Sequence, residues 1–322
     1  MGRIESNTQV RLVRTVAHRP LRRGAHSVDV CGLTQRYHVR GGAGPVCVVV
    51  PGGPGLSWEY MRMPALEQSM TVVYVEPIGT GDSGRLPTHP YGYDRAFSAR
   101  ALDRLLDHLG QERVYLLGHG HGGRVAQYYA LRNPERLSGL ILHGSSPVSG
   151  AELEEETRHQ FERFARRNQS NPELPAVVEA ARVMPTIADD RLLTAAVRRV
   201  LPALVAHYWG RREELTPLRS RLRLSYLSVR RADGTADPVD DRQRLRSLEV
   251  PTLVIAGSYD IVGGMRWGRE LQSLIPNARL LVLAWSGHLG HVEEPERFAE
   301  GVAGFVTATR PMALLHGGML AA

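Results

Sequence analysis

Lysine is absent from this 322-residue sequence, and all 40 of its basic residues are arginine, which is typical of GC-rich codon usage. With 33 acidic residues the formal net charge is +7, a balance that invites a nucleic-acid partner. The arginines are scattered, however, with only short pairs such as Arg22-Arg23 and Arg230-Arg231. No interleaved aromatic residues or helix-turn-helix pattern accompany them. The scattered distribution of the arginines therefore argues against nucleic-acid binding, and an anionic ligand or solubility alone remains as the meaning of the positive charge.

Cysteine is scarce as well, with only Cys31 and Cys47, both in strand-like surroundings. Two such residues exclude a disulfide framework, and we expect reduced, buried thiols. Apolar runs of about 18 residues are missing, so no transmembrane helix is expected. The N-terminus also lacks the apolar stretch of a secretory signal. We therefore expect a cytoplasmic protein without a membrane partner.

The apolar runs and the periodicity between them predict an α/β fold. Short apolar runs such as 46–50 and 71–76 are typical of strands that are covered on both faces, while 95–109 has helical periodicity. Their alternation favours a mostly parallel sheet. Between residues 149 and 245 the sequence shows no strand pattern and consists of charged helical segments. This interval is too long for an ordinary connection between two strands. We predict an N-terminal arm at 1–25 and a C-terminal tail at 311–322. Between them we predict a core formed by 26–148 and 246–310, which opens with a hairpin, and an inserted helical cap at 149–245.

The stretch 114–130 organises the rest of the chain: a short apolar strand enters a glycine-rich turn and leaves as a helix. In a nucleophile elbow, small residues two before and two after the apex allow a sharp, strained turn. Gly118 and Gly122 supply them here, because a β-carbon at either position would collide with neighbouring backbone. Gly120 stands at the apex, where the pattern G-x-S-x-G places serine. The sequence therefore predicts an elbow without its nucleophile.

Several motifs, in the same order along the chain, resemble those of α/β-hydrolases and, within them, proline iminopeptidase-like proteins. Gly52-Gly53-Pro54-Gly55 resembles the HGGPG motif, with Pro51 where histidine is usual, and Gly79-Thr80-Gly81-Asp82-Ser83 resembles the G-x-G-x-S turn. Gly257-Ser258-Tyr259-Asp260 follows the strand that carries the family's acid, and 287–296 resembles the stretch with its catalytic histidine. The resemblance covers 26–148 and 246–308 and implies an α/β-hydrolase fold with a helical cap.

The resemblance also implies roles for individual residues. Asp260 would orient His288 and stabilise its protonated form, while His288 would act as general base beside Gly120. The backbone N–H groups of Gly53 and His121 would form the oxyanion hole. The alternative is that His288 and Asp260 are an inherited hydrogen-bonded pair with no catalytic function. We expect the substrate to contact Trp58, His119, Tyr208, Trp209 and Trp285. For the aromatic rings, ordinary packing is the alternative role.

No cofactor is expected, and no metal site, because His119 and His121 have no carboxylate or cysteine at ligand spacing. Without a hydroxyl at Gly120, no acyl-enzyme can form there. A His–Asp base facing two N–H donors suits proton abstraction with stabilisation of an enolate, phenolate or alkoxide, and it could also activate water. We therefore predict a cofactor-independent, non-hydrolytic lyase, cyclase or carbon–carbon bond-forming enzyme. Its expected place is natural-product biosynthesis, such as that of antibiotics, by analogy with other members of the fold.

Two alternatives stay open. One is a serine hydrolase or iminopeptidase-like esterase inactivated by a serine-to-glycine replacement, natural or engineered. The other is a catalytically silent binding protein, against which the retained His288, Asp260 and glycine loops argue. The predicted cap is rich in arginine and apolar residues, such as Leu201 and Leu204, which favours a bulky apolar or anionic small molecule over a peptide. A homodimer is also compatible with the sequence.

Overall fold

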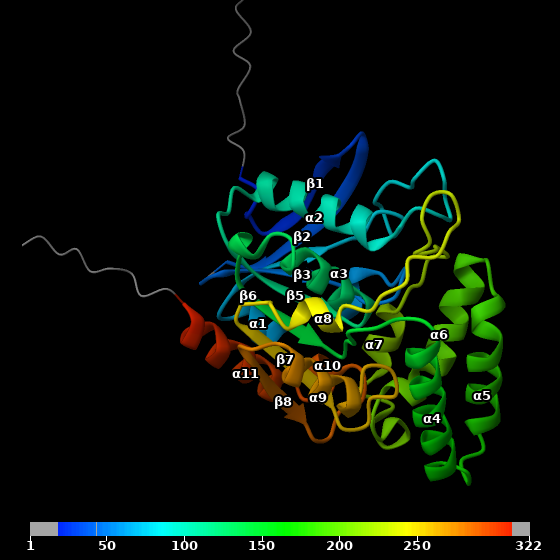
Figure 1. Ribbon diagram of the computed structural model, residues 1–322. Coiled ribbons are helices and arrows are strands. Elements are labelled where there is room, and N and C mark those ends of the chain that lie inside the picture. The colour runs from blue at the N-terminus through cyan, green and yellow to red at the C-terminus, as the bar shows by residue number, and fades with distance from the viewer. Residues whose placement is uncertain (1–18, 43, 311–322) are drawn as a thin grey trace, which may run out of the picture.

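The computed structural model describes residues 19–42 and 44–310 (Figure 1). Within them, eight strands form one sheet in the order β1-β2-β4-β3-β5-β6-β7-β8. β2 pairs antiparallel with β1 and with β4, and every pairing from β4 to β8 is parallel. The predicted mostly parallel sheet is thereby confirmed. The strands are β1 (Gly24–Val30), β2 (Leu33–Gly41), β3 (Val46–Val50), β4 (Thr71–Val75), β5 (Val114–His119), β6 (Leu137–His143), β7 (Thr252–Gly257) and β8 (Ala278–Leu283).

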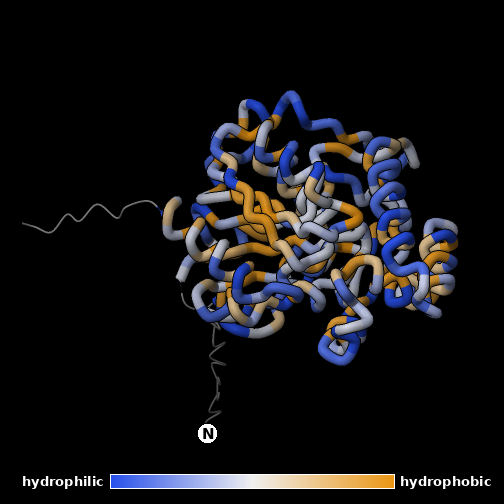
Figure 2. Tube along the Cα trace, turned by 90° about the horizontal axis from the view of Figure 1, so that it is seen from below, coloured by the Kyte–Doolittle hydropathy of each residue, from blue (hydrophilic) through white to orange (hydrophobic). Residues whose placement is uncertain are grey.

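Four of the inner strands are buried along their whole length, as continuous apolar runs predict. Every residue of β3, β4, β5 and β7 is buried. Figure 2 shows the same property as orange segments running through the middle of the molecule, with blue segments around them. Because parallel strands end at the same edge of a sheet, the register that pairs Val50 with Gly118 and His119 with His143 brings the loops after β3, β5 and β6 together.

Helices cover both faces of the sheet. On one face, α2, α3, α8 and α9 pack against the strands through one apolar cluster, and on the other, α1 and α11 contribute to a second cluster. Helix α2 has the bounds that its periodicity predicts, because Asp94 caps its N-terminus and Gly110, at φ 64°, ends it in the left-handed region. The bounds are α1 (Pro64–Glu67), α2 (Arg95–Leu109), α3 (His121–Ala130), α8 (Arg242–Leu245), α9 (Met265–Leu274), α10 (Gly290–Glu293) and α11 (Pro295–Thr309).

Between β6 and β7 the chain forms the helices α4 (Ala151–Arg167), α5 (Leu174–Val183), α6 (Asp190–Leu204) and α7 (Thr216–Arg221), which we call the inserted helices. In Figure 1, α4, α5 and α6 stand together at one end of the sheet. A small apolar cluster, which includes Phe164 and Val200, joins them to Ile261 in the loop after β7. The inserted helices therefore rest on the loops at the carboxyl edge of the sheet.

The segment 222–241 differs from the helical structure expected there, because several of its backbone groups bond to loops of the core. Arg223 O accepts from the N–H of Ser57 at 3.0 Å, and the N–H of Ser225 donates to Gly55 O at 2.9 Å. Farther along, the Arg95 guanidinium forms ion pairs with Asp241 at 2.5 Å and Asp237 at 3.4 Å. A strip of chain thus lies over the loop after β3 and against α2.

Two further expectations need correction. Cys31 is exposed, because it forms the hairpin turn between β1 and β2 with φ 53°, whereas Cys47 in β3 is buried as expected. Strand β1 begins at Gly24, inside the predicted arm. The rest of that arm up to residue 18 and the predicted tail 311–322 lie outside the described residues. Among the described residues, no helix is long and apolar enough to cross a membrane.

The contact between the elbow and β3 leads to a stability prediction. A β-carbon on Gly122 would lie 2.4 Å from the carbonyl oxygens of both Val50 and Pro51. Gly122→Ala should therefore lower the free energy of unfolding by at least about 3 kcal/mol in a urea titration, since rigid backbone cannot yield. Gly304→Ala is the matched control: that position in α11 has open space around it, and the change should be neutral or stabilise by up to about 1 kcal/mol. Equal effects at the two positions would contradict the packing argument.

Candidate active site

Gly120 lies at the strand-to-helix turn between β5 and α3, with φ 51° and ψ −114°. This is a backbone conformation that glycine adopts freely and that strains a residue with a β-carbon. The turn is fixed on both sides, because the Gly120 N–H donates to His143 O at 2.9 Å and the Ser145 hydroxyl donates to Gly120 O at 2.9 Å. The sharp turn therefore forms without a serine at its apex.

Close contacts with neighbouring atoms require the glycines on both sides of the apex. A β-carbon on Gly118 would lie 2.4 Å from Gly122 O, and one on Gly123 would lie 2.4 Å from the Ser145 hydroxyl. At Gly120 itself the situation differs, since a β-carbon there would meet His288 Nε2 at 3.3 Å. The apex thus tolerates a small group only at tight contact with the imidazole.

His288 and Asp260 are brought together beside Gly120 by the loops after β8 and β7. His288 Nδ1 lies 3.0 Å from both carboxylate oxygens of Asp260. Oδ1 of Asp260 also accepts from the N–H groups of Val262 at 2.7 Å and Gly263 at 3.0 Å. Because a carboxylate only accepts, Nδ1 must carry the proton and Nε2 is the basic nitrogen that faces the apex. This is the arrangement of a general base with an orienting carboxylate.

A second group of bonds ties the His288 loop to the end of α6. The His288 N–H donates to Leu204 O at 2.7 Å. The Glu293 carboxylate accepts from Ala206 N–H at 2.7 Å and from Gly287 N–H at 2.9 Å. Burial raises the pKa of Glu293 to about 8, although these two N–H groups act in the opposite direction. The base and the inserted helices are therefore held as one unit.

Buried hydrogen bonds also connect the loop after β3 to the base. His119 Nε2 lies 2.9 Å from His288 O, so it must donate, and His119 Nδ1 is left to accept from the Tyr60 hydroxyl at 2.7 Å. That hydroxyl in turn accepts from Gly52 N–H at 2.6 Å. Burial holds the pKa of His119 well below its usual value, which keeps the ring neutral as this chain of bonds requires. This series of hydrogen bonds therefore fixes the position of the loop after β3 relative to His288.

Gly53 lies in the loop after β3, and His121 follows the apex directly as the first residue of α3. Gly53 has φ 125°, and a β-carbon there would meet the N–H of Gly55 at 2.6 Å. His121 is the first residue of α3, so its N–H has no intrahelical acceptor. Beside His121, burial and the nearby Arg95 lower the pKa of Arg124 to about 10, and this guanidinium forms no ion pair with a carboxylate among residues 19–42 and 44–310. These groups suit a developing negative charge.

The predicted substrate contacts lie in several places. The His119 ring is 4.3 Å from that of His288, but it is fully buried and both nitrogens are bonded, so it positions the base and offers a ligand nothing. Trp58 stacks on His38 at 3.9 Å, a packing role over β2. Tyr208 and Trp209 line a cleft of about 360 Å³ with Tyr259, next to Asp260. Trp285 is 64% exposed near His207.

Sequence reasoning missed Tyr60, Ser145 and Glu293. No local pattern marks them, because each acts on a residue far away in the chain, as Tyr60 does on His119. The described residues contain no group of three or more histidine, cysteine or acidic side chains that could hold a metal ion. The described site therefore combines the His288–Asp260 pair with an apex residue, Gly120, that carries no side chain.

A family profile described as the alpha/beta hydrolase fold matches residues 45–295. Among curated proteins, the chain is 30% identical to a putative carbamate hydrolase RutD from a Caulobacter species, over 80% of this chain and 87% of that protein. It is 24% identical to a putative 2-succinyl-6-hydroxy-2,4-cyclohexadiene-1-carboxylate synthase from Bacillus subtilis, over 82% and 90%. It is also 30% identical to the polyketide synthase ThaQ of Burkholderia thailandensis, over 88% of this chain but only 13% of that protein.

The buried histidines around the site predict acid sensitivity. Burial lowers the pKa of His291 to about 4 and of His121 to about 3, and holds that of His143 well below 6.5. Since the unfolded chain then binds protons first, the stability contributed by each is complete above pH 6.5 and is lost as the pH falls toward 4. The loss should approach about 1.4 kcal/mol per pH unit for each ring.

His143→Phe tests this dependence. The ring packs edge-on against Phe298 at 5.1 Å, and its Nε2 makes one long contact of 3.4 Å with His291 Nδ1, so phenylalanine should keep the packing and remove one titrating group. The free energy of unfolding, measured by urea at pH 7, 6 and 5, should fall less steeply than in the unmodified protein. His159→Phe on exposed α4 should leave the slope unchanged. Identical slopes for His143→Phe and the unmodified protein would refute the assignment.

Proposed function

The chain belongs to the α/β-hydrolase family, and we propose that it is an enzyme of that family which works without a nucleophilic serine. The observation that carries the proposal is the pairing of Gly120, which has no hydroxyl, with a fully assembled His288–Asp260 base at contact distance. An acyl-enzyme needs a nucleophilic side chain at that place. A base and two amide donors need none.

Nearby serines do not replace the missing nucleophile. The Ser145 hydroxyl donates to Gly120 O, the Ser146 hydroxyl donates to Val148 O at 2.8 Å, and the Ser286 hydroxyl donates to Glu294 at 2.6 Å. Each hydroxyl hydrogen is therefore engaged by a protein acceptor away from His288 Nε2. This supports proton transfer, and not covalent catalysis, as the chemistry of the site.

The proposed reaction begins with transfer of a substrate proton to His288 Nε2. The electron pair left behind moves onto a substrate oxygen, which the N–H groups of Gly53 and His121 stabilise as an enolate, phenolate or alkoxide. Asp260 stabilises the imidazolium through Nδ1–H. The same proton then returns from Nε2 to the product or to a leaving group. Rearrangement, cyclisation, elimination or carbon–carbon bond formation all fit this sequence of proton transfers.

We propose further that the substrate is a bulky small molecule and that the enzyme works in a biosynthetic pathway. The inserted helices would act as a cap over a bulky small molecule with an apolar body, and the guanidinium of Arg124, without a carboxylate partner in the described chain, favours an anionic group near His121. No cofactor or nucleic acid enters the proposed reaction. The synthase and polyketide synthase among the relatives support a biosynthetic role, in natural-product pathways.

A hydrolytic alternative is favoured by a specific observation. The relative named as a carbamate hydrolase covers most of the chain, and a water molecule in front of Gly120 would stand beside His288 Nε2, which could activate it directly. An iminopeptidase-like activity has less support. Glu214, one of two acidic residues that follow Trp209, forms an ion pair with Arg211 at 2.6 Å and is not free to hold an amino group.

The absence of a nucleophile predicts resistance to serine-directed reagents. A fluorophosphonate probe should leave the protein unlabelled in intact-mass spectrometry, because the hydroxyls of Ser145, Ser146 and Ser286 bond to acceptors other than His288 Nε2. Stoichiometric labelling that maps to one serine would overturn the proposal. In Gly120→Ser, a β-carbon 3.3 Å from His288 Nε2 would place the new hydroxyl within its reach, so labelling that appears only in this variant would locate the elbow chemistry.

Loss of the base should abolish turnover while the fold persists. His288→Ala should lower kcat by about 10²–10⁴-fold on the physiological substrate, and Asp260→Asn should also impair it through loss of the orienting carboxylate. Circular dichroism checks the fold, and His159→Ala on exposed α4 is the control. The reaction in oxygen-18 water separates the two mechanisms. Solvent oxygen in a released carboxylate would assign the protein to the hydrolases, whereas full activity of His288→Ala would leave only binding by the site.

A further inference from the structure

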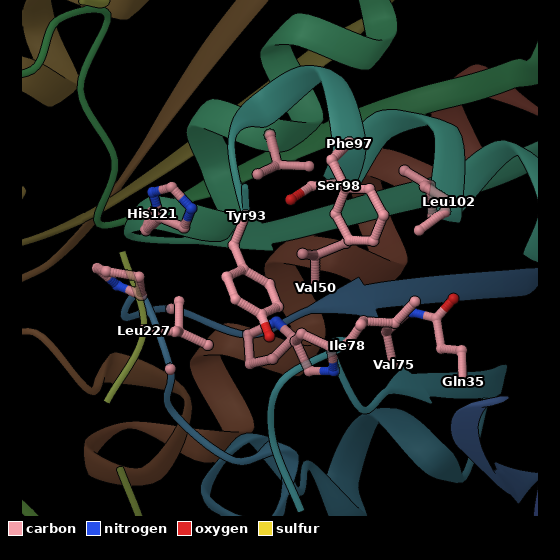
Figure 3. A pocket seen from close by; sticks show the side chains of 17 residues that line it. Gln35, Val50, Val75, Ile78, Tyr93, Phe97, Ser98, Leu102, His121 and Leu227 are labelled. Carbon is pink, nitrogen blue, oxygen red and sulfur yellow. The ribbon is translucent and has the colours of Figure 1, made fainter. Parts of the chain in front are cut away.

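A cavity of about 60 Å³ lies behind the loop after β3, on the α2 side of the sheet. Figure 3 shows its walls, with His121 at one end and Gln35 at the other. Between the two ends the walls are almost entirely apolar, formed by residues such as Val75, Phe97 and Leu102. The cavity therefore extends from the oxyanion side of the elbow into the core.

Gln35 is a buried polar side chain without a partner. It lies in β2, opposite Val28, and is only 2% exposed. Its Oε1 accepts no hydrogen bond from any of the residues that the structure describes. A buried acceptor left in this state is costly, so side chains of this kind are normally satisfied by protein, water or a ligand.

The other polar groups along the cavity are engaged or neutral. The Ser98 hydroxyl donates to Asp94 O at 3.0 Å, and the Tyr93 hydroxyl accepts from Leu86 N–H at 3.0 Å. Burial, together with nearby Arg124, lowers the pKa of His121 to about 3, so its ring carries no charge there. Among these polar side chains, Gln35 Oε1 is thus the buried acceptor that lacks a hydrogen-bond donor.

We propose that this cavity binds a short unbranched aliphatic chain that ends in a hydroxyl or an amide N–H, with Gln35 Oε1 accepting from that end. Since a water-sized group needs about 10–15 Å³ of such space, the cavity holds roughly four to six non-hydrogen atoms. The apolar walls take the chain, and its other end emerges at His121, beside the proposed oxyanion hole. The chain is then the tail of the substrate, a statement that rests on the proposed function.

The test uses two probes of equal size that differ in the donor. Pentan-1-ol carries a terminal hydroxyl, and butyl methyl ether has the same number of heavy atoms and no donor. In NMR titrations, the unmodified protein should bind pentan-1-ol saturably and roughly tenfold more tightly than the ether, as one hydrogen bond to a buried acceptor implies. Gln35→Leu should remove this preference while keeping the cavity, and Gln272→Leu on the exposed face of α9 should preserve it.

Filling the cavity should abolish binding of both probes. Ala101 on α2 lines it, so Ala101→Phe should block entry, and the smaller Ala101→Leu replaces it if the first variant does not fold. His288→Ala, which leaves the cavity intact, should bind pentan-1-ol as the unmodified protein does, so this test fails or succeeds independently of the catalytic proposal. No saturable binding by the folded protein, equal affinity for the two probes, or binding retained in the filled variants would each overturn the assignment and leave the cavity to water.

Discussion

The contact of the α3 N-terminus with the end of β3 is the constraint on which the rest of the site depends. Gly122 passes so close to the carbonyl oxygens of Val50 and Pro51 that no side chain fits between them. This contact sets how near the loop after β3 can lie to the elbow, and therefore where the amides of Gly53 and His121 stand relative to each other. This close approach is made by backbone alone, so it does not depend on which residue stands at the apex.

The features predicted from sequence are those whose cause is local. Helix α2 is bounded by Asp94 and Gly110, and the buried strands are continuous apolar runs, so both are visible without a fold. The motif order also placed His288 and Asp260 on loops that the parallel sheet brings to one edge. Residues that act at a distance left no such trace. Tyr60, Glu293 and Gln35 look ordinary in the sequence, and only the folded chain reveals their partners or the lack of one.

The parts of the structure that differ from the sequence-based predictions also depend on residues far away in the chain. The start of the segment 222–241 carries no helix where Arg223 and Ser225 bond to the loop at Gly55 and Ser57, partners that no window of sequence contains. Cys31 reads as a strand residue between Val30 and Leu33, yet it occupies the hairpin turn with a positive φ. His119 reads as a pocket residue because it precedes the apex, while its ring turns inward to Tyr60 and to the backbone of His288.

The bonds between 204–206 and the His288 loop have a consequence for how the site can be entered. Leu204 O holds the His288 amide, and Glu293 holds Ala206 and Gly287 together. A movement of the end of α6 away from this loop would break these bonds, and Asp260 alone would then hold the His288 side chain. The inserted helices and the His288 loop are therefore mechanically coupled, and a displacement of one is transmitted to the other.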